Sequence, residues 1–372
     1  AAAFRRRGRR AGAMKHGPLA GVVLGAALWA APARATDPDV AARIQHGIEA
    51  VYKMEFDECE RTFRQLLKDY PGHPYGYFGL AAAYWSRFEY EQEESDLSLH
   101  EAFEKSIDDG VARGQEWLKA HPGDSDAFVC VSAMYGLRSR LSMMLHRWIR
   151  AYLDGTKALK LIHRAVELDP KQYDANTGLG MWDYYTDTLP GVVKVLGRIV
   201  SIRGDAPRGI ARLKLAAEKG RFTSTTAKLI LVELYQDRHT PYFNPKEGLR
   251  MIREIRKGYP MNPLFHFVEL IYLYEGGQGP EAVRSAEDML KGIHEGRRFY
   301  HPRYAPRAYA GLGTAHFLAK DWAKAAAAFG EGAKVLLEKP GRHNRWGLYS
   351  LIRRGQVRDV QGDRAGAVED YK

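Results

Sequence analysis

The sequence predicts an all-α protein built from helical hairpins in series. Apolar residues recur at helical spacing along nearly the whole chain. Short breaks containing Pro or Gly interrupt this pattern roughly every fifteen to twenty residues, as expected where one helix turns into the next. Period-two alternation is rare and no Asn-Gly pair is present, so β-hairpins are not expected.

Length and composition favour a folded array over one compact core. The chain has 372 residues, of which 45% are hydrophobic and 27% are charged. These proportions are typical of folded soluble proteins, which argues against global disorder. Chains of this length divide into several domains or form repeats.

The net charge of +11 does not indicate a nucleic-acid binder. Seven basic residues and no acidic ones lie in residues 1–35, and the remainder holds 49 basic and 45 acidic residues. A DNA or RNA binder needs a clustered basic face on its folded body. No nucleic-acid partner is therefore expected.

Residues 14–35 have the pattern of a secretory signal peptide. A basic start at Met14 precedes an apolar run from Gly17 to Ala31. Ala33 and Ala35 satisfy the small-x-small rule, which predicts cleavage after Ala35 and an exported protein, periplasmic or secreted. The apolar run is short for a bilayer span, and an uncleaved membrane anchor is the alternative.

The two ends of the sequence are abrupt. Residues 1–13 precede the first methionine and are expected to be translated upstream sequence, or an extended basic start, without order. The last repeat stops at Lys372 partway through its second helix, with no polar capping helix. We therefore expect the folded body to span residues 36–372 and its C-terminal end to be truncated.

Five segments share one internal spacing of small, aromatic and Pro residues. The matches are Gly47, Cys59, Phe63 and Pro71; Leu80, Ala81 and Tyr84; Ala158, Ala165 and Pro170; Leu312, Gly313, Ala325 and Phe329; and Gly355, Ala367 and Tyr371. This pattern resembles the tetratricopeptide repeat (TPR), a helical hairpin of about 34 residues. The resemblance implies an α-α superhelix, here a right-handed solenoid of about eight hairpins, that recognises peptides or proteins on a concave face.

The spacing has a physical cause. Small residues such as Gly47 and Gly313 let two antiparallel helices approach closely, and Phe63 and Phe329 fill the space between hairpins. Pro71 ends a second helix because it cannot continue the hydrogen-bond ladder. No hairpin buries its apolar face alone, so the units must stack.

The array is irregular. Insertions are expected near residues 86–110, 138–157 and 186–207, and weaker hairpins at residues 223–259 and 262–293. The first insertion is acidic from Glu89 to Asp109 and is interpreted as a solvated helix face or a docking site for a basic partner.

The other two insertions are richer in apolar residues. Arg138–Arg150 mixes Arg with Met and Trp, which suits a partner helix or a membrane surface, although internal packing against the acidic insertion is favoured. Trp182–Ile202 is apolar over most of its circumference and is interpreted as a buried lid or as part of a ligand groove.

No catalytic constellation is present. The chain lacks H-E-x-x-H, G-x-S-x-G and a phosphate loop, so no enzyme activity is expected. The histidines are scattered, and neither a metal nor a cofactor is expected. Cys59 and Cys130 lie among helix-core residues and are interpreted as buried thiols, with a disulfide between them as the alternative.

The sequence thus predicts a non-catalytic binding or scaffold/adaptor protein of the cell envelope, peripherally associated at most, with a protein or peptide partner. Aromatic residues are the candidate contacts on the concave face: Tyr84, Tyr135, Trp182, Tyr184 and Tyr185. The alternative is an envelope factor that binds polysaccharide or lipid through the insertion at residues 182–202. An enzyme of unfamiliar type is a third hypothesis.

Overall fold

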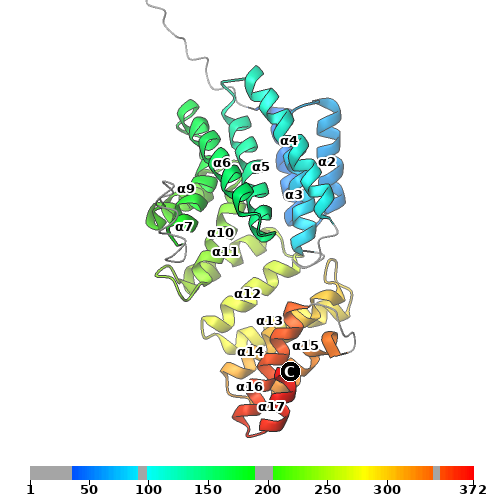
Figure 1. Cartoon of the computed structure of the whole chain (residues 1–372). Helices are drawn as coiled ribbons and strands as arrows, with labels where there is room; N and C mark the ends of the chain where they lie inside the picture. The colour runs from blue at the N-terminus through cyan, green and yellow to red at the C-terminus, as the bar shows by residue number, and fades with distance from the viewer. Residues whose placement is uncertain (1–35, 91–98, 189–203, 338–343) are drawn as a thin grey trace, which may run out of the picture. The chain divides into compact units, whose positions relative to one another are not determined.

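The computed structural model describes residues 36–90, 99–188, 204–337 and 344–372, and every regular element in these ranges is helical (Figure 1). The expectations for residues 1–35, for residues 91–98 of the first insertion and for most of the third insertion lie outside the described residues. The all-α prediction is confirmed.

Sixteen α-helices in the described residues follow one another as eight hairpins. The hairpins are α1 Pro38–Tyr52 with α2 Phe56–Asp69; α3 Pro74–Tyr90 with α4 His100–Ala120; α5 Ser125–Met144 with α6 Trp148–Leu168; α7 Ala175–Asp187 with α9 Ala206–Lys219; α10 Ser224–Gln236 with α11 Pro245–Gly258; α12 Pro263–Glu275 with α13 Gly279–His294; α14 Ala305–Leu318 with α15 Trp322–Leu337; and α16 Arg345–Val360 with α17 Arg364–Tyr371. The short 3-10 helix η1, Pro302–Tyr304, precedes α14. The weaker hairpins predicted from sequence are present as α10–α11 and α12–α13.

Several helices begin with an Asp or Asn cap followed directly by Pro. Asp37 caps α1, Asn244 caps α11 and Asn262 caps α12, and each side chain accepts a hydrogen bond from a backbone N–H of the first turn. The side-chain oxygen satisfies an N–H that has no partner within the helix, and Pro at the first helical position loses no hydrogen bond.

The second insertion lengthens existing helices. Residues 138–157 form the end of α5 and the start of α6, which have 20 and 21 residues. Residues 100–110 of the first insertion belong to α4, which also has 21 residues. These three long helices lie together, and they position the candidate site described below.

A glycine on the first helix of a hairpin faces an aromatic ring from the second helix. This contact recurs at Gly47–Phe63, Gly313–Phe329 and Gly355–Tyr371, each pair separated by sixteen positions. A Cβ atom on Gly313 would lie 2.5 Å from Phe329 Cδ1, so a larger residue cannot share this space unless the ring moves. The residue twelve positions after each glycine is fully buried: Cys59, Ala325 and Ala367.

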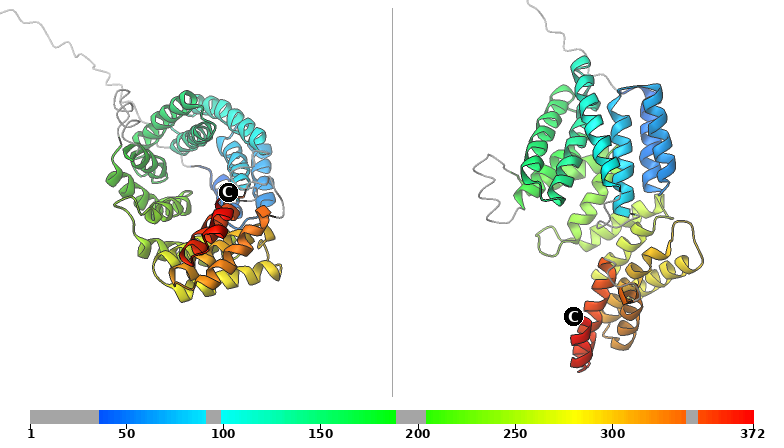
Figure 2. Two further views of the ribbon diagram at one scale, coloured as in Figure 1. Left: turned by 60° about the horizontal axis from the view of Figure 1, so that its bottom comes forward. Right: turned by 45° about the vertical axis from the view of Figure 1, so that its right-hand side comes forward.

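The turn between α1 and α2 packs against helices that follow it by more than 170 positions (Figure 2). The Tyr52 hydroxyl lies 2.7 Å from Thr226 Oγ1, and Asn262 Nδ2 donates to the Tyr52 carbonyl at 3.0 Å. The Tyr259 hydroxyl donates to Glu49 Oε1 at 3.1 Å. Tyr52 therefore belongs to the same buried cluster as residues of α10, α11 and α12.

Candidate functional site

Six large apolar side chains are exposed together at the turn between α5 and α6. We call them the α5–α6 patch: Met143, Met144, Trp148, Ile149, Tyr152 and Leu153. Trp148 is 63% exposed and Ile149 is 78% exposed. Trp148 and Tyr152 are four positions apart, as are Ile149 and Leu153, so the four side chains form two adjacent rows on one side of α6.

A seam of serines fixes α5 against α6 beneath the patch. The hydroxyls of Ser125, Ser132 and Ser139 donate to the carbonyls of Ala165, Ala158 and Ala151 at 3.0, 2.9 and 2.8 Å. The donors advance by seven residues as the acceptors retreat by seven, which is the register of two antiparallel helices in close contact. Serine is small enough for this approach, and each hydroxyl has a partner.

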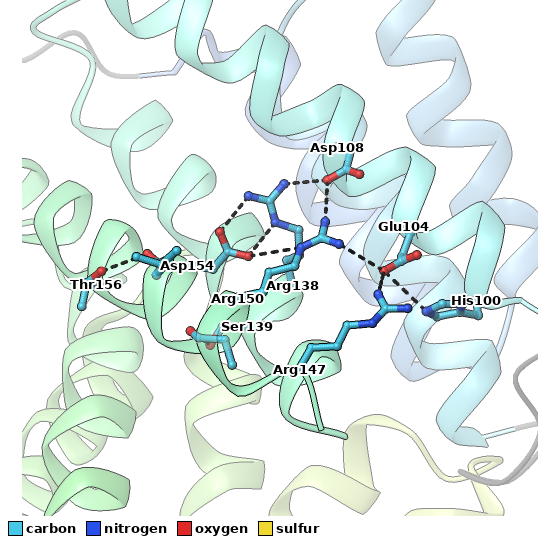
Figure 3. A network of polar contacts seen from close by, with 11 residues as sticks. His100, Glu104, Asp108, Arg138, Ser139, Arg147, Arg150, Asp154 and Thr156 are labelled. Atoms are coloured by element: carbon cyan, nitrogen blue, oxygen red, sulfur yellow. Dashed lines mark hydrogen bonds and ion pairs between the residues drawn. The ribbon is translucent and has the colours of Figure 1, made fainter. Parts of the chain in front are cut away.

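An ion-pair network joins the same hairpin to α4 (Figure 3). Arg138 on α5 donates to both carboxylate oxygens of Asp154 on α6, each at 2.8 Å, and to Asp108 Oδ1 on α4 at 2.6 Å. Arg147, just before α6, donates to Glu104 Oε1 on α4 at 2.8 Å. Glu104 and Asp108 of the acidic segment therefore pack against Arg147 and Arg138 of the basic segment, which confirms the favoured interpretation at these contacts.

Burial and pairing act in opposite directions on Arg138. Burial alone disfavours its charge, but the hydrogen bonds that Arg138 donates to Asp154 and Asp108 outweigh this, so the pKa of Arg138 is raised above its ordinary value. The side chains of Arg147 and Arg150 are 44% and 40% exposed, whereas that of Glu104 is 25% exposed. The cations of this part of the network are thus nearer to solvent than the carboxylate they share.

The structure does not bring the five predicted aromatic contacts into one surface. Tyr135 and Tyr184 are buried. Gln115 Nε2 donates to the Tyr135 hydroxyl at 2.6 Å, and the Tyr184 ring packs on Tyr242 with centroids 5.7 Å apart. Both side chains therefore serve the core.

The other three predicted contacts retain access to solvent to different degrees. The Tyr84 hydroxyl accepts from Arg64 Nη2 at 3.0 Å, which turns it toward α2. Trp182 is half-buried and its ring borders Gly155 of α6. Tyr185 is 38% exposed. Partial burial and, to a smaller extent, the nearby Glu233 carboxylate raise the pKa of its hydroxyl.

The α5–α6 patch extends beyond the segment that the sequence pattern singled out. The basic segment ending at Arg150 includes Trp148 and Ile149, but Tyr152 and Leu153 follow it. The spacing of four from Trp148 to Tyr152 and from Ile149 to Leu153 was the signal that could have found them. The basic segment has two functions in the fold, since Arg138 and Arg147 pair internally while Met143, Met144, Trp148 and Ile149 face solvent.

Among the described residues, no group of three or more His, Cys, Asp or Glu is arranged to hold a metal ion. Cys59 and Cys130 are both free, buried thiols, which confirms the favoured interpretation and leaves no disulfide between them. Burial raises the pKa of Cys59 to about 12. None of the described helices has the length and apolarity needed to cross a bilayer.

The glycine–aromatic contact recurs at one spacing in hairpins from both ends of the array. The fold is TPR-like. No protein-family model matches the chain, and the search of curated proteins gives no match.

Solved structures similar to this TPR-like chain include PilW, described as a widely conserved type IV pilus biogenesis factor, with a TM-score of 0.40 and 14% identity over 64% of this chain and 90% of PilW. Yeast Tom70 has a TM-score of 0.32 and 10% identity over 86% of this chain and 74% of Tom70. The TPR domain of P58(IPK) has a TM-score of 0.24 and 14% identity over 90% of this chain and 91% of that domain.

Proposed function

We propose that this TPR-like chain is a non-catalytic scaffold of the cell envelope that binds a protein partner through the α5–α6 patch. The partner segment is an amphipathic helix with an apolar stripe and acidic flanks. The observation that carries the proposal is the joint exposure of Trp148 and Ile149 beside Tyr152 and Leu153.

Leaving these apolar side chains in contact with water is unfavourable in free energy. Burying one such side chain stabilises a complex by roughly 1.5–3 kcal/mol before the costs of association. Contiguous apolar patches with a polar rim are typical of interaction sites, and Trp and Tyr dominate binding energy where they are buried. The serine seam and the ion pairs hold the patch in place, so little ordering is needed on binding.

Charge selects the partner among apolar helices. Basic side chains border the patch at Arg147, Arg150 and Lys157; the first two also pair with Glu104 and remain 44% and 40% exposed. The buried Asp154 is already engaged by Arg138. A helix with Glu or Asp beside its apolar stripe fits this rim, whereas a Lys-flanked helix is repelled by it.

The envelope location rests on the leader at residues 14–35, whose basic start, apolar run and Ala-x-Ala end support export. Fractionation of cells that express the tagged chain tests this part directly.

Binding is tested with two synthetic helical peptides that share one Leu stripe and carry either Glu or Lys on its flanks. We expect the Glu-flanked peptide to bind, and Trp148→Glu with Ile149→Glu to weaken it at least tenfold in fluorescence anisotropy. The control is Leu348→Glu with Ile352→Glu on α16, which alters two exposed apolar residues outside the patch.

Equal binding of both peptides, or equal loss in the control variant, would contradict the proposal. Patch-dependent binding to anionic phosphatidylglycerol vesicles without peptide binding would instead support a membrane surface as the ligand. If the Glu-flanked peptide binds through the patch, a photo-crosslinking residue placed at position 152 in intact cells then identifies the natural partner.

A further inference from the structure

The residue after the predicted cleavage site is held by a carboxylate ninety positions away. The Thr36 backbone N–H donates to Asp126 Oδ2 at 3.0 Å, and the Thr36 hydroxyl donates to the same oxygen at 2.5 Å. The other oxygen, Oδ1, accepts from Gln172 Nε2 at 2.7 Å. Asp126 lies in the first turn of α5, where the helix dipole favours a negative charge.

We propose that Asp126 is the receptor for the α-ammonium group that signal-peptide removal creates at Thr36. Hydrolysis by a signal peptidase consumes one water and breaks the bond between the Ala35 carbonyl carbon and the Thr36 nitrogen. Ala35 leaves with a carboxylate, and the Thr36 nitrogen gains protons and a positive charge. This inference rests on the proposed export of the chain.

The Thr36 nitrogen already lies within hydrogen-bond distance of Asp126 before it becomes charged. In the uncut chain the Thr36 nitrogen is a neutral amide with one N–H, and that N–H already points at Asp126. In the cut chain the same nitrogen carries three N–H donors, and the hydrogen bond becomes an ion pair. Charge-assisted hydrogen bonds are about twice as strong as neutral ones, so cleavage strengthens a contact that needs no rearrangement.

The surroundings favour a cation at this position. Asp37 follows Thr36 directly, Asp39 lies in the first turn of α1, and Asp124 precedes Asp126 by two residues. His73 lies near Asp124 and Asp126, and burial lowers its pKa below the ordinary value. The new ammonium group therefore meets several carboxylates.

Removal of the signal peptide therefore stabilises the packing of the segments that meet at this contact. Thr36 precedes α1, Asp126 begins α5, and Gln172 lies between α6 and α7. An exported chain is thus more stable after cleavage than before it, and the gain depends on one carboxylate.

The test compares purified chains that begin at Thr36 with chains that carry Gly-Ser before Thr36, each with Asp126 and with Asp126→Asn. At pH 6.5 we expect the Thr36-start chain to melt about 1–2 °C higher than the extended chain. Asp126→Asn should abolish this difference, whereas Asp39→Asn, which removes an exposed carboxylate of α1, should preserve most of it.

The pH dependence follows from the amine. Pairing raises its pKa in the folded state above the ordinary value of about 8, so the stabilisation is complete below pH 8 and is lost as the pH rises beyond it. A melting difference that persists unchanged at pH 10, or survives Asp126→Asn, overturns the inference. So does the absence of a difference at pH 6.5.

N-terminal sequencing of the exported protein separates the two proposals. An exported chain that begins at Thr36 supports both. An exported chain cut at another bond overturns the Asp126 inference and leaves the envelope location standing. A chain that stays uncut inside the cell overturns both.

Discussion

At the scale of single residues, the fold depends on glycines that leave room for a ring. Gly313 and Phe329 are in direct contact, as are Gly355 and Tyr371. A methyl group at these glycines meets the ring, and the well-packed interior gives it little room to move. Gly330, in the same hairpin as Gly313, has no neighbour this close.

Gly313→Ala and Gly330→Ala form a matched pair, since both lie within helices of the α14–α15 hairpin. A Cβ at Gly330 lies 3.7 Å from its nearest neighbour, Arg354 Nη1, which is ordinary contact. We expect Gly313→Ala to lower the free energy of unfolding by about 1–3 kcal/mol and Gly330→Ala to raise it by about 0.5–1 kcal/mol. Urea unfolding measures both, and a stabilising Gly313→Ala would contradict the ring-contact argument.

A buried histidine gives the fold a defined response to acid. His266 lies between the Tyr300 hydroxyl at 2.9 Å and Ser285 Oγ at 3.1 Å, and burial, followed by the charge of Arg256, lowers its pKa to about 4. The unfolded state therefore binds more protons than the folded state between pH 4 and about 6.5.

Stability should accordingly fall as the pH drops from 6.5 toward 4, and His266 should account for about 3 kcal/mol of that loss. His266→Gln cannot take up this proton, so its unfolding free energy should change less over the same interval. Parallel stability–pH curves for the two proteins would show that His266 is not the sensitive group.

At the scale of elements, α5 and α6 are joined by two kinds of polar contact. The serine seam sets their separation and register, and the Arg138–Asp154 pair ties them to α4 through Asp108. Asp154 is buried, whereas Arg147 at the edge of the network is open to solvent. Removing one partner should therefore lower the free energy of unfolding by very different amounts in these two pairs.

Asp154→Ala leaves the Arg138 charge with one partner in a partly buried site. We expect it to destabilise the chain by about 3 kcal/mol, because breaking a buried pair leaves an uncompensated charge. Arg147→Ala, a control in the same network, should cost less than about 1 kcal/mol, as exposed pairs do. Thermal unfolding distinguishes them, and equal losses would mean that burial does not set the cost here.

At the scale of the whole described unit, contacts across long stretches of sequence join the first hairpin to the sixth. Asn262 has two separable tasks in this joint. Its Oδ1 caps α12 by accepting from Leu264 and Phe265 N–H, and its Nδ2 donates to the Tyr52 carbonyl. One side chain thus starts a helix and fastens the α1–α2 turn.

Substitutions at Asn262 separate the two tasks. Asn262→Asp keeps the capping oxygen and loses the donor to Tyr52, so hydrogen exchange should accelerate at residues 48–56 more than at α12. Asn262→Ala should accelerate both regions. The control Asn244→Ala, which removes only the cap of α11, should cost about 0.5–2 kcal/mol and leave residues 48–56 unchanged. Protection at residues 48–56 that is unchanged in Asn262→Asp would contradict the proposed joint.

The sequence by itself determined the helices, their pairing and the repeated contact, because these depend on neighbours within about 34 positions. Helical periodicity, Asp-Pro and Asn-Pro caps and the glycine–aromatic spacing are all local. The opposite charges of adjacent segments also indicated the contacts of Asp108 with Arg138 and of Glu104 with Arg147.

Tertiary structure alone decided which aromatic side chains stay accessible and which distant segments meet. Tyr135 and Tyr184 have the same residue type as Tyr152, yet the first two are buried and the third is exposed. Burial depends on how neighbouring hairpins stack, and periodicity does not record that. The Thr36–Asp126 and Tyr52–Asn262 contacts likewise depend on where the stacked hairpins bring the chain, because small rotations at each step add up over many residues.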